Sequence, residues 1–218
     1  MSAERTARPS LITWIGLFIA LFGMVIVGQV VKAVAPERTI SSTIAREAGM
    51  WLVGLTLLVI VKVGERKPLS SIGIGTARFW RSTLWGFLLG VVCLAVAIVL
   101  VAATGYTGGE GGKFMQSLPL LLVNLIVIRA GVVEEICYRG YAIERLSELG
   151  LPRSAAAAVP LVIFAVAHWT GGWANIVIAL VLGGILAAFY LWRRDLVANM
   201  IGHWLVDFIG NVVPRLFR

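Results

Sequence analysis

The sequence predicts an all-α membrane protein, a bundle of about seven transmembrane helices with its active site between the fourth, fifth and seventh. Three observations support this. The 218 residues are 59% hydrophobic and only 14% charged, whereas a soluble domain is about 45–50% apolar and about 25% charged. The mean hydropathy is +0.92. Long uncharged segments of membrane-spanning length recur along the chain. We expect residues 1–218 to form a single transmembrane domain.

The first three helices are predicted from segments with little or no charge. Leu11–Val31 contains no charged residue and is longer than the apolar region of a signal peptide. The second helix, at about residues 40–61, is the weakest because it carries charges in its first turns. Trp85–Ala103 forms the third. The basic connector at residues 62–81 leaves room for an eighth segment.

The second half of the chain is predicted to hold four more helices. A glycine-rich segment, residues 105–112, is expected to be a loop, and it lacks the lysine that a phosphate-binding loop requires. The fourth helix starts near Ser117 and runs to about Glu148, where a glycine and a proline end it. The last three helices are predicted at about residues 154–169, 173–191 and 196–213.

Positive charges predict the orientation of the bundle. If the helices alternate from a cytoplasmic N-terminus, roughly twice as many Lys and Arg residues fall on the inner side as on the outer side. The net charge of +8 is therefore explained by topology, and we expect an integral membrane protein whose surroundings are lipid. The sequence predicts no nucleic-acid partner.

The stretch at residues 131–141 is the centre of the predicted site. It places Glu134, Glu135 and Arg139 in apolar sequence, where each ionisable group costs roughly 2.5–3.5 kcal/mol on insertion scales. Glu135 and Arg139 are four residues apart and are expected to pair on one helical face. Glu134 would then be unpaired and suited to act as a general base. An ordinary Glu–Arg pair at a helix end is the structural alternative, but it leaves the second glutamate unexplained.

Both histidines of the chain also lie in predicted spans. Glu134 precedes the turn at Leu151 by as many residues as His168 follows it, so both would reach the same depth in an antiparallel hairpin. His203, in the seventh helix, falls at a similar level. Asp207 lies one turn beyond His203 and is expected to orient its ring. Three helices thus bring ionisable groups to one place.

Three short motifs resemble those of the CAAX protease and bacteriocin-processing (CPBP) family of intramembrane endopeptidases. They stand in the family's order, as Glu134-Glu135-x-x-x-Arg139-Gly140, Phe164-Ala-Val-Ala-His168 and His203-Trp-Leu-Val-Asp207. The resemblance covers about residues 117–212, and the helices before it carry no motif.

The resemblance implies hydrolysis of peptide bonds in a membrane-associated substrate, lipidated or CAAX-type proteins among them, in a bacterial or archaeal cell membrane. Glu134 would activate water with the help of His168, and His203 would stabilise the oxyanion together with residue 207. The predicted Glu–Arg ion pair would support the site. An asparagine at 207 would donate a hydrogen bond to the oxyanion, whereas an ionised aspartate only accepts. Asp207 would therefore orient His203 or help to hold a metal.

Metal dependence and two other functions stay open at this point. Glu134, His168 and His203 are a ligand set that Zn²⁺ accepts, with a position left for water, and a metal-free mechanism fits the same residues. The alternatives are a non-catalytic bacteriocin self-immunity or scaffold protein and, less favoured, a proton-coupled transporter that uses the same buried groups as a relay. A transporter would show an inverted repeat, and the sequence shows no such symmetry.

Overall fold

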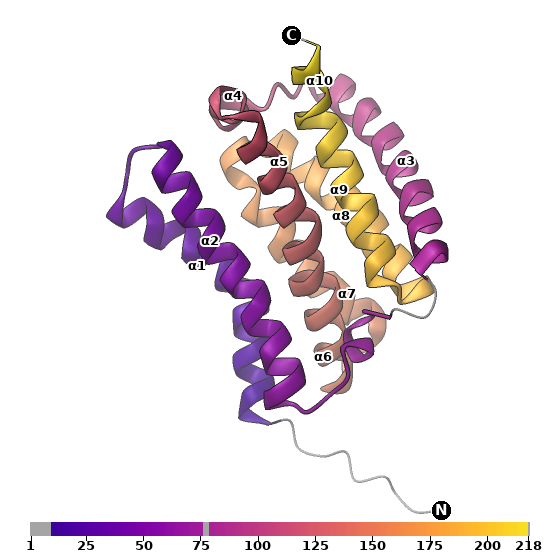
Figure 1. Cartoon of the computed structure of the whole chain (residues 1–218). Helices are drawn as coiled ribbons and strands as arrows, with labels where there is room; N and C mark the ends of the chain where they lie inside the picture. The colour runs from indigo at the N-terminus through magenta and orange to yellow at the C-terminus, as the bar shows by residue number, and fades with distance from the viewer. Residues whose placement is uncertain (1–9, 76–78, 218) are drawn as a thin grey trace, which may run out of the picture.

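The computed structural model describes residues 10–75 and 79–217, and this part of the chain forms a helical bundle without strands (Figure 1). The predicted all-α fold is confirmed. The long helices are α1 (Leu11–Val34), α2 (Ile40–Val59), α3 (Phe79–Thr104), α7 (Arg153–Ala167), α8 (Trp173–Arg193) and α9 (Leu196–Asn211). A further unit joins α5 (Leu120–Arg129), the π-helix η3 (Ala130–Tyr141) and α6 (Ala142–Glu148) end to end. The short elements are η1 (Ile60–Gly64), η2 (Leu69–Ile72), α4 (Gly109–Ser117), η4 (Trp169–Gly171) and α10 (Val213–Leu216).

Some of these helices are long enough to span a membrane. Among the described residues, five helices are long and apolar enough to cross a bilayer, namely Leu11–Val34, Ile40–Gly64, Phe79–Thr104, Trp173–Arg193 and Leu196–Leu216. The unit from α5 to α6 carries several charges, and α7 has only 15 residues, so the count of seven spans stays a prediction. Between η1 and α3 the described residues form only the short helix η2, which leaves no eighth long helix there.

The predicted fourth helix differs from the structure in two ways. It begins at Leu120 instead of Ser117, because Leu118 is extended (ψ 154°) and the following Pro119 restricts it to that conformation. Its middle, Ala130–Tyr141, is π-helical. Such helices are rare and occur frequently at functional sites. Hydrophobic periodicity does not distinguish them from α-helix, so the π-helix could not be predicted from the sequence.

The glycine-rich segment at 105–112 was expected to be a loop, and the structure corrects its second half. The helix α4 starts at Gly109, directly after Gly108 in the left-handed conformation (φ +81°). Glycine is a poor helix former, but Phe114 and Met115 pack against a buried apolar cluster that α5 and α9 supply. Tertiary packing therefore outweighs helix propensity here. The short helix α4 also contacts η4, beside the end of α7.

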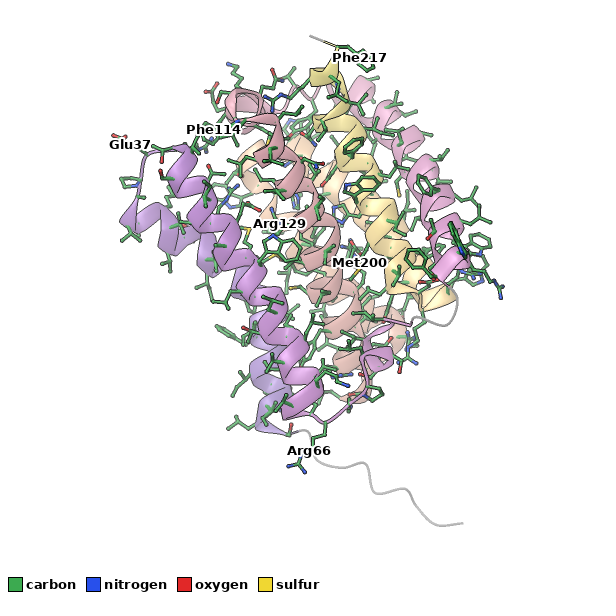
Figure 2. The ribbon with its side chains drawn as sticks, in the orientation of Figure 1. Glu37, Arg66, Phe114, Arg129, Met200 and Phe217 are labelled. Carbon is green, nitrogen blue, oxygen red and sulfur yellow. The ribbon has the colours of Figure 1, made fainter. Side chains whose placement is uncertain are left out.

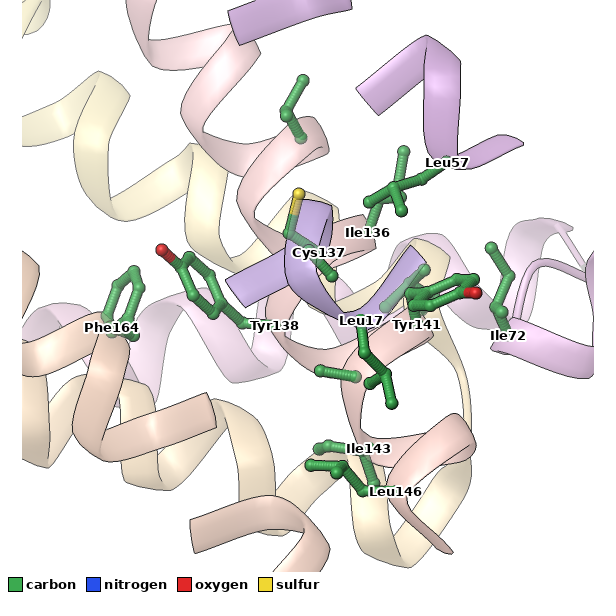
Figure 3. Packing of buried hydrophobic residues seen from close by; sticks show 14 of the residues in the cluster. Leu17, Leu57, Ile72, Ile136, Cys137, Tyr138, Tyr141, Ile143, Leu146 and Phe164 are labelled. Atoms are coloured by element: carbon green, nitrogen blue, oxygen red, sulfur yellow. The ribbon is translucent and has the colours of Figure 1, made fainter. Parts of the chain in front are cut away.

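The main hydrophobic core lies where α1, α2, η3, α6 and α7 meet (Figure 3). Leu17 of α1, Leu57 of α2 and Ile136 of η3 are all buried in this cluster. Ile72 of η2 is fully buried in the same cluster, so the connector after α2 folds back onto the bundle. A smaller cluster lies between α3, α8 and α9. The main cluster contains residues of η3, and the smaller cluster includes a residue of α9, the helix that packs against η3. Together they hold η3 in place.

Ion pairs of buried carboxylates stabilise the end of the bundle where α6 lies. Glu65, just after η1, accepts a hydrogen bond from Tyr141 (2.7 Å) and pairs with the fully buried Arg145 (2.7 Å). Glu144 pairs with Arg194 (2.7 Å) in the turn between α8 and α9. These contacts tie the connector, α6 and the last hairpin together, and they leave the middle of the bundle to the site described below.

Close packing of α3 against α9 depends on glycine. A Cβ added at Gly86 would lie 2.6 Å from Cβ of Ile201 and 2.9 Å from the carbonyl oxygen of Ala198. Gly202 of α9 faces the backbone of α3 in the same way, since a Cβ added there would lie 3.2 Å from the carbonyl oxygen of Gly86. Small residues commonly allow membrane helices to approach so closely.

Replacement of Gly86 by valine is expected to destabilise the fold by about 1–3 kcal/mol through overpacking. The thermal unfolding temperature of the purified protein, measured in detergent, should fall accordingly. Gly28→Val is the matched control, since no atom lies within 4 Å of a Cβ built at Gly28 on α1. An unchanged unfolding temperature for Gly86→Val, or an equal loss in both variants, would contradict this packing.

Candidate functional site

Glu135 lies at the centre of the site and is fully buried in η3. Its Oε1 accepts a hydrogen bond from Nη1 of Arg139 (2.7 Å) and lies 2.8 Å from Nδ1 of His203. Its Oε2 accepts one from Nδ2 of Asn199 (3.2 Å). The Glu135–Arg139 pair that the sequence predicts is therefore present. A buried carboxylate with both oxygens bonded forms a rigid support for the groups around it.

His203 is oriented by Glu135. A carboxylate only accepts hydrogen bonds, so the 2.8 Å contact puts a proton on Nδ1. The other ring nitrogen, Nε2, then faces Oε2 of Glu134 at 4.0 Å and Oδ2 of Asp207 at 3.7 Å. We expected Asp207 to orient the ring, but its distance exceeds that of a hydrogen bond. The structure gives the orienting contact to Glu135 instead.

Glu134 is paired, contrary to the expectation that it would be free. Its Oε1 accepts a hydrogen bond from Nη1 of Arg129 (2.6 Å). The guanidinium of Arg129 also donates from Nε to Oε2 of Glu47 on α2 (2.8 Å). Arg129, the last residue of α5, lies in the middle of the bundle, on the side of α5 that faces α2 (Figure 2). The other carboxylate oxygen of Glu134 is the one that faces His203.

Arg129 and Glu47 are the site residues that the sequence reasoning missed. Arg129 precedes Glu134 by five residues, a spacing that does not align two side chains on an α-helix. It does so here because the intervening helix is π-helical, with its hydrogen bonds running between residues five apart. Glu47 lies 82 positions from Arg129. The only available signal was the presence of both charges inside apolar helices.

His168 lies directly after the last residue of α7, as its C-cap. Its Nδ1 is 2.8 Å from the carbonyl oxygen of Phe164, one turn earlier, so this local contact fixes the ring. The Phe164 ring lies between the two histidines, with its centroid 4.6 Å from that of His168 and 6.4 Å from that of His203. The guanidinium of Arg139 lies 4.6 Å from the same centroid. The phenylalanine of the second motif thus separates the side chains of His168, His203 and Arg139.

A cavity of about 160 Å³ opens beside these groups. His168, His203 and Asp207 supply much of its polar wall. Apolar residues of α3, α8 and α9 form the rest, Cys93 and Leu182 among them. Glu134 is not among the described residues that line this cavity. It faces His203, which does line it.

The structure thus gathers most of the residues predicted for the site. Glu134, Glu135 and His203 are in mutual contact or near contact, and His168 and Asp207 share the cavity with His203. The predicted convergence of three helices is what the geometry shows.

Zinc binding by Glu134, His168 and His203, which the sequence left open, stays a prediction. Among the described residues, no group of three or more His, Cys, Asp or Glu side chains has an arrangement that could hold a metal ion. Oε1 of Glu134 is engaged by Arg129, and Nδ1 of each histidine is engaged by an oxygen. Oε2 of Glu134 and Nε2 of His203 face each other at 4.0 Å without a hydrogen bond. We derive no step through a metal.

Comparison with known proteins gives a match to a family model. A family model described as Rce1-like, type II CAAX prenyl endopeptidase, matches residues 116–209. This range contains all three motifs and both histidines. No curated protein and no solved structure shows a significant match to the chain.

Proposed function

We propose that this chain is an intramembrane endopeptidase of the CPBP family that uses Glu134 to activate water. Its substrate is a membrane-associated peptide, with a prenylated C-terminal peptide as the first choice. The match of residues 116–209 to the Rce1-like family model supports the peptidase activity, and the geometry around Glu134 supports the assignment of the residues.

The observation that carries the proposal is the 4.0 Å gap between Oε2 of Glu134 and Nε2 of His203. Two polar atoms at this separation are too far apart for a direct hydrogen bond and are well placed to share one water molecule. Glu134 is held from behind by Arg129, and His203 is held from behind by Glu135. Both groups that face the water are therefore fixed before a substrate arrives.

The reaction then follows general acid–base chemistry. The water oxygen attacks the scissile carbonyl carbon while Glu134 takes a proton from the water. When the His203 ring carries both protons, its Nε2–H can donate to the oxyanion that forms, and His168 lies in the same cavity as a second polar group. As the C–N bond breaks, Glu134 returns its proton to the leaving amine. An ionised Asp207 can only accept hydrogen bonds, so we assign it to the support of a protonated His203.

The walls of the cavity favour an apolar substrate segment beside the scissile bond. The side that α3, α8 and α9 contribute is apolar, while the polar groups cluster at the other side. Pockets of this kind orient a ligand by a few polar groups and bind it by apolar contact. We further propose that the end of the bundle rich in positive charge, where α6 lies, faces the cytoplasm.

Cleavage by the purified protein tests this function. Wild-type protein in lipid nanodiscs is incubated with a farnesylated CAAX peptide that carries a fluorophore and a quencher on either side of the expected bond. We expect fluorescence to rise, and mass spectrometry to find the released C-terminal tripeptide. The same peptide without the farnesyl group is the control for substrate class.

The outcome also separates the alternatives. A scaffold or immunity protein would bind the farnesylated peptide without cleaving it, and its binding would be unaffected by Glu134→Ala and His203→Ala. Cleavage of the non-prenylated peptide at the same rate would retain the peptidase and overturn the prenylated substrate.

A further inference from the structure

Arg129 holds two carboxylates from two distant parts of the chain. Its Nη1 donates to Glu134, while its Nε and Nη2 face the carboxylate of Glu47 at 2.8 and 3.5 Å. The N–H groups of a guanidinium are fixed in one plane. A carboxylate that is bonded to the Nε side of the guanidinium therefore sets the direction in which Nη1 points.

This carboxylate is buried and comes from α2. The side chains of Glu47 and Arg129 are only 8% and 7% exposed, so water cannot replace either partner readily. Glu47 has one further basic contact, to the half-exposed Arg46 at 3.3 Å. A buried charge pair of this kind is costly to break from one side. The orientation of the guanidinium therefore depends on Glu47.

The two oxygens of Glu134 have different surroundings as a result. Oε1 is held by Arg129, and Oε2 faces Nε2 of His203 across the gap in which the reacting water is proposed. If Arg129 turned, the carboxylate would turn with it and Oε2 would leave this position. Misplacement by about 1 Å costs about 100-fold in rate in well-oriented sites.

We propose that Arg129 and Glu47 are positioning residues for the general base: Glu47 of α2 fixes the guanidinium of Arg129, which in turn aims the carboxylate of Glu134 at the site of attack. This inference rests on the proposed function of Glu134. It also means that the N-terminal helices, outside the matched range 116–209, complete the active site. A purely structural pair would need one carboxylate, whereas Arg129 bridges two and one of them faces the cavity-lining His203.

The first test is kinetic and uses the nanodisc assay with the farnesylated peptide. We expect Glu47→Gln to lower kcat by about tenfold and Arg129→Gln by about 100-fold, with KM changed less than about twofold in both. Arg129→Lys keeps the charge without the planar fork and should fall between wild type and Arg129→Gln. Arg46→Gln removes a neighbouring charge from the same helix and should leave kcat unchanged. Equal losses in kcat for Arg46→Gln and Arg129→Gln would overturn the proposal.

The second test needs no turnover. Dicyclohexylcarbodiimide adds to a protonated carboxyl group in apolar surroundings, and the adduct rearranges to a stable N-acylurea that contains all atoms of both reactants. Mass spectrometry of peptides that contain residue 134 gives its labelling rate in each variant. Loss of the cation in Arg129→Gln leaves Glu134 more often protonated, so labelling should be about tenfold faster than in wild type.

Glu47→Gln should have the opposite effect on labelling. It leaves Glu134 as the main carboxylate partner of Arg129, so Glu134 stays ionised more firmly and should be labelled several-fold more slowly. A general loosening of the fold would speed labelling in both variants, and that result, or no change in either, would overturn the proposal. If wild-type protein cleaves nothing while the two labelling rates shift in opposite directions, the proposed function fails and the positioning network stands.

Discussion

Replacement of Glu134 by glutamine is expected to lower kcat for the farnesylated peptide by about 10²–10⁴-fold, the range that general acid–base catalysis supplies. Glutamine has nearly the same shape, and its carbonyl oxygen can still accept the hydrogen bond from Arg129. It cannot take a proton from water. Because the lost interaction belongs to the transition state, KM should change little. The measurement is steady-state cleavage by purified variants in nanodiscs.

A control separates this effect from damage to the fold. Glu110→Gln changes an exposed glutamate on α4 that pairs with the neighbouring Lys113, and it should leave kcat unchanged. Arg129 keeps Glu47 as a partner in Glu134→Gln, so the unfolding temperature should stay near that of wild type. A well-folded Glu134→Gln protein that cleaves at the wild-type rate would remove Glu134 from the mechanism.

Replacement of Glu135 by glutamine is expected to destabilise the protein by about 3–5 kcal/mol, since it leaves the buried Arg139 without a countercharge. It also removes the carboxylate that orients His203. We therefore expect both a lower unfolding temperature and a strong loss of cleavage. Thermal unfolding in detergent and the nanodisc assay measure the two effects separately.

A second variant distinguishes the two roles of Glu135. In Glu135→Gln combined with Arg139→Gln, both charges are gone, so much of the stability should return. Cleavage should not return, because His203 still lacks its orienting partner. Glu110→Gln is again the surface control: Glu110 is 82% exposed beside Lys113, and such pairs contribute about 0–1 kcal/mol. Recovery of cleavage in the double variant would show that Glu135 acts only through stability.

Charge spacing and apolar segment length were sufficient to predict the main features of the bundle. The uncharged stretches gave the long helices, because a chain in lipid satisfies its backbone by forming helix wherever apolar sequence is long enough. The four-residue spacing of Glu135 and Arg139 gave their ion pair, because that spacing aligns side chains on a helix. Equal distance from the turn at Leu151 predicted a common depth for Glu134 and His168, and His168 does share a cavity with His203, which faces Glu134.

The features that could not be predicted depend on tertiary context. Arg129 reaches Glu134 only through π-helical geometry, and no residue pattern in this segment distinguishes it from α-helix. The same ambiguity hid the pairing of Glu134, which was expected to be free. Glu47 acts across 82 positions, and a single sequence carries no signal for such a contact. The helix α4 forms against the propensity of its glycines because the partly buried Phe114 and Met115 pack against an apolar cluster.

The most direct test of the central claim is an experimental structure of the Glu134→Gln variant with an uncleaved farnesylated peptide. The account predicts that the scissile carbonyl lies in the cavity lined by His168, His203 and Asp207. Its carbon should be about 3–3.5 Å from a water held between side chain 134 and His203. A peptide bound with its scissile bond away from this cavity would contradict the account.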